Sequence, residues 1–241
     1  MKKYRSSIKD IIVIILCLAW ILLCSGSVGS NGVRFAKRAV CMANMKRLTH
    51  AWIACAQDND GYVPSGSPGS GTRPWLGTFG RRDIIEDGSL WPYCRDYSLY
   101  RCPNGRSSEQ VTYAAVESVV GTGSIPTPNR DIYIRNLSDV TEAKASRRMV
   151  FIDIGYFKPD IFAVFNDQYA WSDYAPFRHE LGTCVSFVDG HSEYWGWNDP
   201  GTVQSTRPPE SHHGPIVPSV YNQDLIRLQI AVWGKLGYTL P

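Results

Sequence analysis

Two histidines and one aspartate around a short turn are the residues of this chain best suited to chemistry. His179, Asp189 and His191 offer two imidazoles and a carboxylate within a short stretch of sequence, and that set of donors suits zinc. However, Asp189 precedes Gly190, where an aspartate is favoured for the backbone geometry of a turn. His179 is also placed to hydrogen-bond the same loop. A metal-dependent hydrolase built on these residues is therefore one hypothesis, and a structural role for them is the favoured one.

Cysteine is the second residue type whose chemistry the sequence leaves open. The chain has seven cysteines, and Cys17 and Cys24 lie in an apolar run where they serve as small hydrophobic side chains. No two cysteines have the C-x-x-C spacing of a zinc ribbon or a thioredoxin-type motif. In an exported chain we expect a disulfide that involves Cys102, although the spacing does not identify its partner. The pairing stays open among an odd set of five: Cys41, Cys55, Cys94, Cys102 and Cys184.

The remaining sequence favours a protein that is not an enzyme and has no cofactor. It contains no G-x-S-x-G, H-E-x-x-H, P-loop or G-x-G-x-x-G motif. The net charge of +3 is weak and its basic residues are scattered, so nucleic acid is not an expected partner. Trp171, Trp195 and Trp197 are candidates for stacking on a sugar in a surface binding module for glycans or proteins. Filling the core beneath long loops is the more ordinary use of such side chains.

The elements that must position these residues begin with an apolar N-terminal run, Ile11 to Leu23. Lysines and an arginine precede it, which predicts a membrane anchor with its N-terminus in the cytoplasm. A cleaved signal peptide, ending near Ser27 or Ser30, is the alternative. Asp10 favours retention, because a signal peptide normally has no acidic residue at that place.

A helix is predicted to continue beyond the apolar run, from Arg34 to Gln57. Its apolar residues recur at steps of three and four, which is the spacing of one helix face. The cluster Asp58-Asn59-Asp60-Gly61 is typical of a turn that ends the helix, and it lacks the spacing of a calcium-binding loop. The predicted face consists of Phe35, Cys41, Met45, Leu48, Trp52 and Cys55.

Three further elements are predicted in the rest of the chain. Met149 to Ile154 is apolar and β-branched, as in a buried strand. Asp189-Gly190 between two strand-like runs predicts a hairpin with a two-residue turn, with Val188 opposite His191. In that register Val185, Phe187 and Tyr194 face the core, and Ser186, His191 and Glu193 face the solvent. Asn222 to Gly234 is predicted to be a helix capped by Asn222.

These segments, in this order, resemble bacterial prepilin-like proteins. His179, nine residues, then Asp189-Gly190 looks like the H-X9-DG motif of the DUF1559-type and type II secretion pseudopilin-like proteins. The stretch from Ala39 to Leu48, with Gln57 to Pro64, is similar to the helix and exit turn of that family. Cys102-Pro103 is similar to the Cys-Pro of the family, and the residues from Leu225 to Gln229 are similar to its tail. Together these stretches cover nearly the whole chain.

The resemblance implies an α+β fold in which a long N-terminal transmembrane helix packs on an antiparallel β-sheet head, as in pilins. The implied domains are a membrane anchor over residues 1–33, an extramembrane continuation of the helix over 34–61, and a globular head over 62–241. The implied function is that of a structural subunit of a type II secretion or type IV pilus-like assembly. Its partners would be the membrane and other pilin-like subunits, in a homo- or hetero-oligomer. It would span the bacterial inner membrane once, with the head periplasmic or extracellular.

The N-terminus departs from the Gly-Phe-Thr-Leu-Ile-Glu signal of that family. Arg5 stands where the family has the glycine before the cleavage point, Ser6 stands in place of the phenylalanine, and Asp10 stands in place of the glutamate. Asp10 is therefore the candidate assembly residue, pairing with the N-terminal amine of a neighbouring subunit. The sequence leaves open whether the chain is cut after Arg5, methylated there, or retained intact.

Overall fold

A computed structural model of the chain describes residues 7–27, 29–65, 74–77, 83–120, 132–154, 161–204, 217–218 and 221–240. The chain forms two compact units, Met1–Lys37 and Arg38–Pro241. The first unit contains helix α1 (Ile8–Ser27) and the start of helix α2 (Ser30–Gln57), so the boundary between the units falls within α2. The sequence predicted a single long helix over this region, whereas two helices are found. Val28 and the candidate processing residues Arg5 and Ser6 lie outside the described residues.

The predicted transmembrane helix is not supported. Among the described residues, no helix is both long enough and apolar enough to cross a membrane. The prediction of a single-pass inner-membrane protein was therefore wrong.

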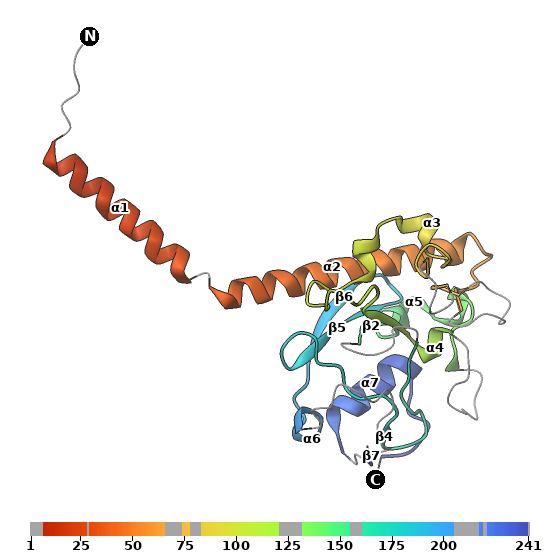
Figure 1. Cartoon of the computed structure of the whole chain (residues 1–241). Helices are drawn as coiled ribbons and strands as arrows, with labels where there is room; N and C mark the ends of the chain where they lie inside the picture. Colours follow the sequence, from red (N-terminus) through yellow and green to blue (C-terminus); the bar gives the residue numbers. More distant parts are fainter. Residues whose placement is uncertain are drawn as a thin grey trace. The chain divides into compact units, whose positions relative to one another are not determined.

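The second unit is organised around a mixed five-stranded sheet with the order β3-β1-β2-β5-β6 (Figure 1). Its strands are β1 (Tyr113–Val116), β2 (Met149–Asp153), β3 (Ile161–Phe162), β5 (Gly182–Phe187) and β6 (Ser192–Gly196). The β1–β2, β2–β5 and β5–β6 pairs are antiparallel, but β1 and β3 run parallel. The α+β class is therefore correct and the expectation of an antiparallel sheet is not. The strand predicted at Met149 to Ile154 is confirmed as β2.

Short elements complete the second unit. Strands β4 (Ala170–Trp171) and β7 (Val217–Pro218) form a separate antiparallel pair. The short helices are α3 (Trp91–Cys94), η1 (Tyr97–Tyr100), α4 (Glu117–Val120), η3 (Leu137–Asp139), α5 (Glu142–Ala145) and α6 (Pro200–Gln204). They lie on the connections between the strands and helices of the core.

Helix α2 covers one face of the sheet through the face that the sequence predicted. Cys41, Met45, Leu48, Trp52 and Cys55 are all buried, while Phe35, in the first unit, is 57% exposed. Polar contacts fix the helix on the strands, since Thr49 Oγ1 donates to Ser186 Oγ at 2.7 Å and Ser192 Oγ donates to the Met42 carbonyl at 2.9 Å. Because both faces of the sheet are covered, every residue of β1, β2 and β5 is buried.

Helix α7 (Gln223–Trp233) lies on the opposite side of the strands from α2 (Figure 1). Its cap agrees with the sequence, because the Asn222 side chain accepts a hydrogen bond from Leu225 N at 2.8 Å. Gly234 ends the helix with a φ of 79°, the left-handed conformation usual after a C-terminus. The guanidinium of Arg227 lies 3.7 Å from the ring centroid of Trp195 on β6. This second helix therefore helps to cover Trp195, which is 4% exposed, on the edge strand β6.

The hairpin of β5 and β6 is confirmed, but its register differs by one residue from the prediction. Ser186 is opposite Ser192 and Val185 is opposite Glu193, and Phe187 N donates to the His191 carbonyl. The loop therefore has three residues rather than two. Tyr194 consequently shares a face with Cys184 and not with Val185. The predicted core and solvent faces are therefore wrong for β6, because a shift of one residue moves each of its side chains to the other face relative to β5.

Candidate functional site

The sheet and α2 together bring four potential metal ligands into one buried cluster. Cys41 comes from α2, Cys102 follows η1, Asp153 ends β2, and His179 lies in the loop before β5. The sulfur, nitrogen and oxygen atoms of these side chains all lie within 4.8 Å of one another. Within the described part of the chain, this is the one group of three or more such residues that is arranged to hold a metal ion. We call it the Cys–Asp–His cluster.

Three distances define the interior of the cluster. Cys41 Sγ donates to Asp153 Oδ2 at 3.3 Å, and Cys102 Sγ lies 3.2 Å from His179 Nε2. His179 Nε2 is also 3.5 Å from the same Asp153 oxygen. None of the four residues is more than 3% exposed. A carboxylate, an imidazole and two thiols thus meet in a site from which bulk water is excluded.

A shell of polar groups surrounds the cluster and holds its members. Arg178 Nε lies 3.3 Å from Asp153 Oδ1, the oxygen that faces away from the thiols. The same guanidinium reaches both carboxylate oxygens of Glu109, at 3.1 and 3.2 Å. Tyr113 OH donates to Cys41 Sγ at 3.4 Å. Asp153 Oδ1 and Cys41 Sγ therefore each accept a hydrogen bond from a residue of the surrounding shell.

The chain next to Cys102 adds a backbone contact. Asn104 N donates to Cys102 Sγ at 3.4 Å, and the side-chain amide of Asn104 lies 3.2 Å from His179 Nδ1. Cys102 N in turn donates to Thr112 Oγ1 at 2.7 Å. Pro103, which the resemblance marks together with Cys102, stands between these two anchored residues and is itself exposed. The Cys-Pro segment therefore positions one thiol of the cluster.

The electrostatics of the cluster follow from its burial and from its hydrogen bonds. Burial raises the pKa of the Cys41 thiol, because the thiolate would lose its hydration. The contact with Cys41, together with burial, raises the pKa of Cys102. Burial lowers the pKa of His179, but the hydrogen bonds to Asp153 and Cys102 outweigh it and bring that pKa to about 9. Burial and these contacts therefore favour the protonated form of both thiols and of His179.

The sequence-predicted trio does not meet at one place. His179 lies in the Cys–Asp–His cluster, whereas Asp189, Gly190 and His191 form the end of the β5–β6 hairpin. There His191 Nδ1 lies 2.5 Å from Asp189 Oδ1, and its Nε2 lies 3.2 Å from Glu193 Oε1. Gly190 has a φ of 88°. The H-X9-DG motif thus has two structural parts, one in the buried cluster and one in the turn.

Sequence reasoning missed Asp153 as a site residue, and it considered Cys41 for the apolar face of a helix and for a disulfide but not as a metal ligand. Asp153 had been included in a strand because the five residues around it are apolar, yet an aspartate in such a strand was itself a signal. Cys41 had been placed on the buried face of a helix, which is correct. Asp10, the candidate assembly residue, lies in the first turn of α1 and accepts a hydrogen bond from Ser7 N at 2.8 Å. The three tryptophans considered for sugar stacking, Trp171, Trp195 and Trp197, are buried.

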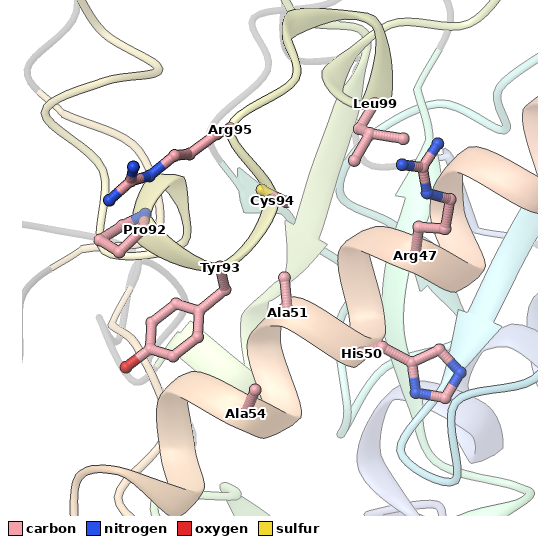
Figure 2. A pocket seen from close by; sticks show the side chains of 9 residues that line it. All are labelled: Arg47, His50, Ala51, Ala54, Pro92, Tyr93, Cys94, Arg95 and Leu99. Atoms are coloured by element: carbon pink, nitrogen blue, oxygen red, sulfur yellow. The ribbon is translucent and has the colours of Figure 1, made fainter.

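A surface pocket lies between α2 and the segment from α3 to η1 (Figure 2). This pocket has a volume of about 480 Å³. Figure 2 shows Ala51 and Ala54 of α2 facing Pro92 and Tyr93 of α3. Arg47 and Arg95 provide charge, and Tyr93 OH donates to Asp58 Oδ2 at 3.0 Å beside it. The lining is Arg47, His50, Ala51, Ala54, Pro92, Tyr93, Cys94, Arg95 and Leu99.

Comparison of the chain with protein-family models, with curated proteins and with solved structures gives no match.

Proposed function

We propose that this protein is a non-enzymatic structural subunit of the pseudopilin-like class, and that it assembles with further copies of itself through α1. The observation that carries the proposal is the exposure of α1. Its large apolar side chains, among those whose burial is described, range from 48% exposed at Ile11 to 76% at Ile8. They point in all directions around the helix, as in helices that are covered on every side by other protein.

Exposure on this scale has a large energetic consequence. Removing one such side chain from water contributes roughly 1.5–3 kcal/mol. A single groove would cover one face of α1 and leave the other faces exposed. A bundle of like helices covers all of them, and small residues such as Ala19 and Gly26 allow close approach of backbones in such a bundle. This argument favours other α1 helices as the occupant.

The head supports a structural role rather than a catalytic one. The side chains of the Cys–Asp–His cluster are the most reactive group among the described residues, and they are closed off from solvent. A substrate would have no route to them in this arrangement. The three buried tryptophans likewise offer no stacking surface for a glycan. A folded head together with a helix that exposes apolar side chains is the combination expected of a subunit in a type II secretion or type IV pilus-like assembly.

Analytical ultracentrifugation of the full chain in mild detergent tests the proposal. We expect oligomers for the natural sequence, and a shift to monomer when Ile14→Asp and Leu18→Asp are combined. Asp10→Leu should weaken association as well, because Asp10 could then no longer pair with the N-terminal amine of a neighbouring subunit. Val40→Asp is the matched control, since Val40 is also an exposed apolar residue but belongs to the head. A natural chain that stays monomeric at all concentrations would refute the proposal.

A further inference from the structure

We propose that Cys41, Cys102, Asp153 and His179 bind one zinc ion as a closed, four-ligand structural centre. The inference concerns the head alone and does not depend on the assembly role of α1. The site joins α2, the Cys-Pro segment, the end of β2 and the loop before β5. Zinc is the metal that such a set of two sulfurs, one imidazole nitrogen and one carboxylate oxygen suits best.

The geometry already approaches that of a tetrahedral site. Zinc bonds of about 2.3 Å to sulfur and about 2.0 Å to nitrogen or oxygen place neighbouring ligand atoms roughly 3.3–3.8 Å apart. The separations of 3.3 Å for Cys41 Sγ to Asp153 Oδ2 and 3.5 Å for His179 Nε2 to Asp153 Oδ2 fall in that range, and the 3.2 Å of Cys102 Sγ to His179 Nε2 is just below it. The other pairs lie within 4.8 Å, so a small contraction closes the site.

Charge also favours a cation at this place. Zinc binding releases the protons of the two thiols and the Nε2 proton of His179, so that two thiolates, one carboxylate and one neutral imidazole face the ion. The three negative charges exceed the charge of the ion by one. Arg178, in contact with Asp153 Oδ1, supplies the compensating positive charge. Glu109, whose carboxylate is partly exposed on the outer side, in turn holds Arg178 in place.

The second shell has the features that ligating groups require. Asn104 N and Tyr113 OH point at the two sulfur atoms, one at each, and stabilise thiolates there. Asn104 Nδ2 lies 3.2 Å from His179 Nδ1, and with the amide turned by 180° its oxygen would accept the Nδ1 proton of a ring that binds the ion through Nε2. All four positions are filled by protein side chains that are almost fully buried. The absence of a position for substrate or water makes the site structural rather than catalytic.

Metal analysis of the full chain tests this inference. The protein is purified under reducing conditions, loaded with a small excess of zinc, desalted and analysed by mass spectrometry for bound metal. We expect one zinc per chain, and a loss of that zinc in Cys41→Ser and His179→Gln. Cys55→Ser is the matched control, because Cys55 is also a buried cysteine of α2 but lies outside the cluster. It should retain the full equivalent.

Cobalt substitution of the natural chain keeps the test decisive if the variants do not fold. A tetrahedral thiolate site gives cobalt intense visible bands and a sulfur-to-metal charge-transfer band in the near ultraviolet. We expect both bands to appear at one equivalent and to be displaced by zinc. A folded natural chain that binds substoichiometric zinc and gives no such bands would overturn the inference. Full zinc retention by both Cys41→Ser and His179→Gln would overturn it too. So would a Cys41–Cys102 disulfide that persists after treatment with a reductant and zinc.

Discussion

The guanidinium of Arg178 bridges two carboxylates, and its contact with Asp153 links the loop before β5 to the end of β2. Arg178 Nε lies 3.3 Å from Asp153 Oδ1, and both side chains are at most 1% exposed. The partner on the outer side, Glu109, is 18% exposed. Arg178, which precedes the H-X9-DG histidine His179, therefore also helps to organise the buried cluster. A buried pair of this kind stabilises a fold only while it is complete.

Replacing Arg178 by methionine should strongly destabilise the head. Arg178→Met removes the guanidinium from the buried Asp153 carboxylate, and breaking a buried ion pair typically costs about 3–5 kcal/mol. Urea unfolding followed by circular dichroism measures this loss. Arg47→Met is the control, since Arg47 and Asp96 form a long, exposed pair at 3.8 Å, and exposed pairs contribute about 0–1 kcal/mol. Equal losses in the two variants would contradict the role assigned to Arg178.

Gly190 should not tolerate a side chain. Its φ of 88° is unfavourable for other residues, and a Cβ there would lie 2.7 Å from Cε1 of His50 on α2. We expect Gly190→Ala to lose about 1–2 kcal/mol of unfolding free energy from the backbone alone. Gly196→Ala is the control, because its nearest contact would be an ordinary 3.7 Å. Adding His50→Ala to Gly190→Ala should recover only the part of the loss that comes from the clash.

The elements that bury apolar side chains could be predicted from local patterns. The face of α2, strand β2 and the capped helix α7 all follow from periodicity and from Asn222 and Gly234 at the helix ends. The hairpin was located correctly but its register was not. A two-residue type I′ turn needs positive φ at both central residues, and Gly190 meets this requirement whereas Asp189 does not. The loop therefore takes one more residue, and every pair shifts.

The buried cluster could not be predicted because its members are distant in sequence. Cys41 and Asp153 are 112 residues apart, and Cys102 and His179 are 77 apart. No spacing rule connects them, and only the packing of α2 and of the Cys-Pro segment against the sheet brings them together. His179, Asp189 and His191 were grouped because they are close in sequence. Yet His179 contacts Cys102 and Asp153 in the buried cluster, while Asp189 and His191 pair with each other at the end of the hairpin. The parallel β1–β3 pair likewise depends on tertiary structure, since β3 has only two residues.

His191 should have a pKa above its ordinary value of about 6.5. Burial lowers the pKa, but the carboxylates of Asp189 and Glu193 on its two ring nitrogens raise it further than burial lowers it. The stabilisation is then complete below pH 6.5 and is lost as the pH rises through the folded-state pKa. Because the ring is 38% exposed, the effect on stability is small and the pKa is the better observable.

An NMR titration of the His191 ring protons measures that pKa directly. Asp189→Asn should move it down, because the nearest negative charge is removed. Glu193→Gln should move it down by less, since that carboxylate is at 3.2 Å and not at 2.5 Å. A pKa at or below 6.5 in the natural chain would mean that burial, and not the two carboxylates, dominates at the hairpin end.

Thr49 and Ser186 should show coupled energies, because their hydroxyls hydrogen-bond each other at 2.7 Å in the buried interface between α2 and β5. Thr49→Val leaves the Ser186 hydroxyl without this partner, and Ser186→Ala does the same to Thr49, at a cost of about 1–2 kcal/mol each. The double variant removes both polar groups and should lose less than the sum, with a coupling of about 1 kcal/mol. Thr49→Val combined with Asn222→Ala, at the distant cap of α7, should be additive. Additivity in the first pair would show that the hydrogen bond between Thr49 and Ser186 does not help to hold α2 on β5.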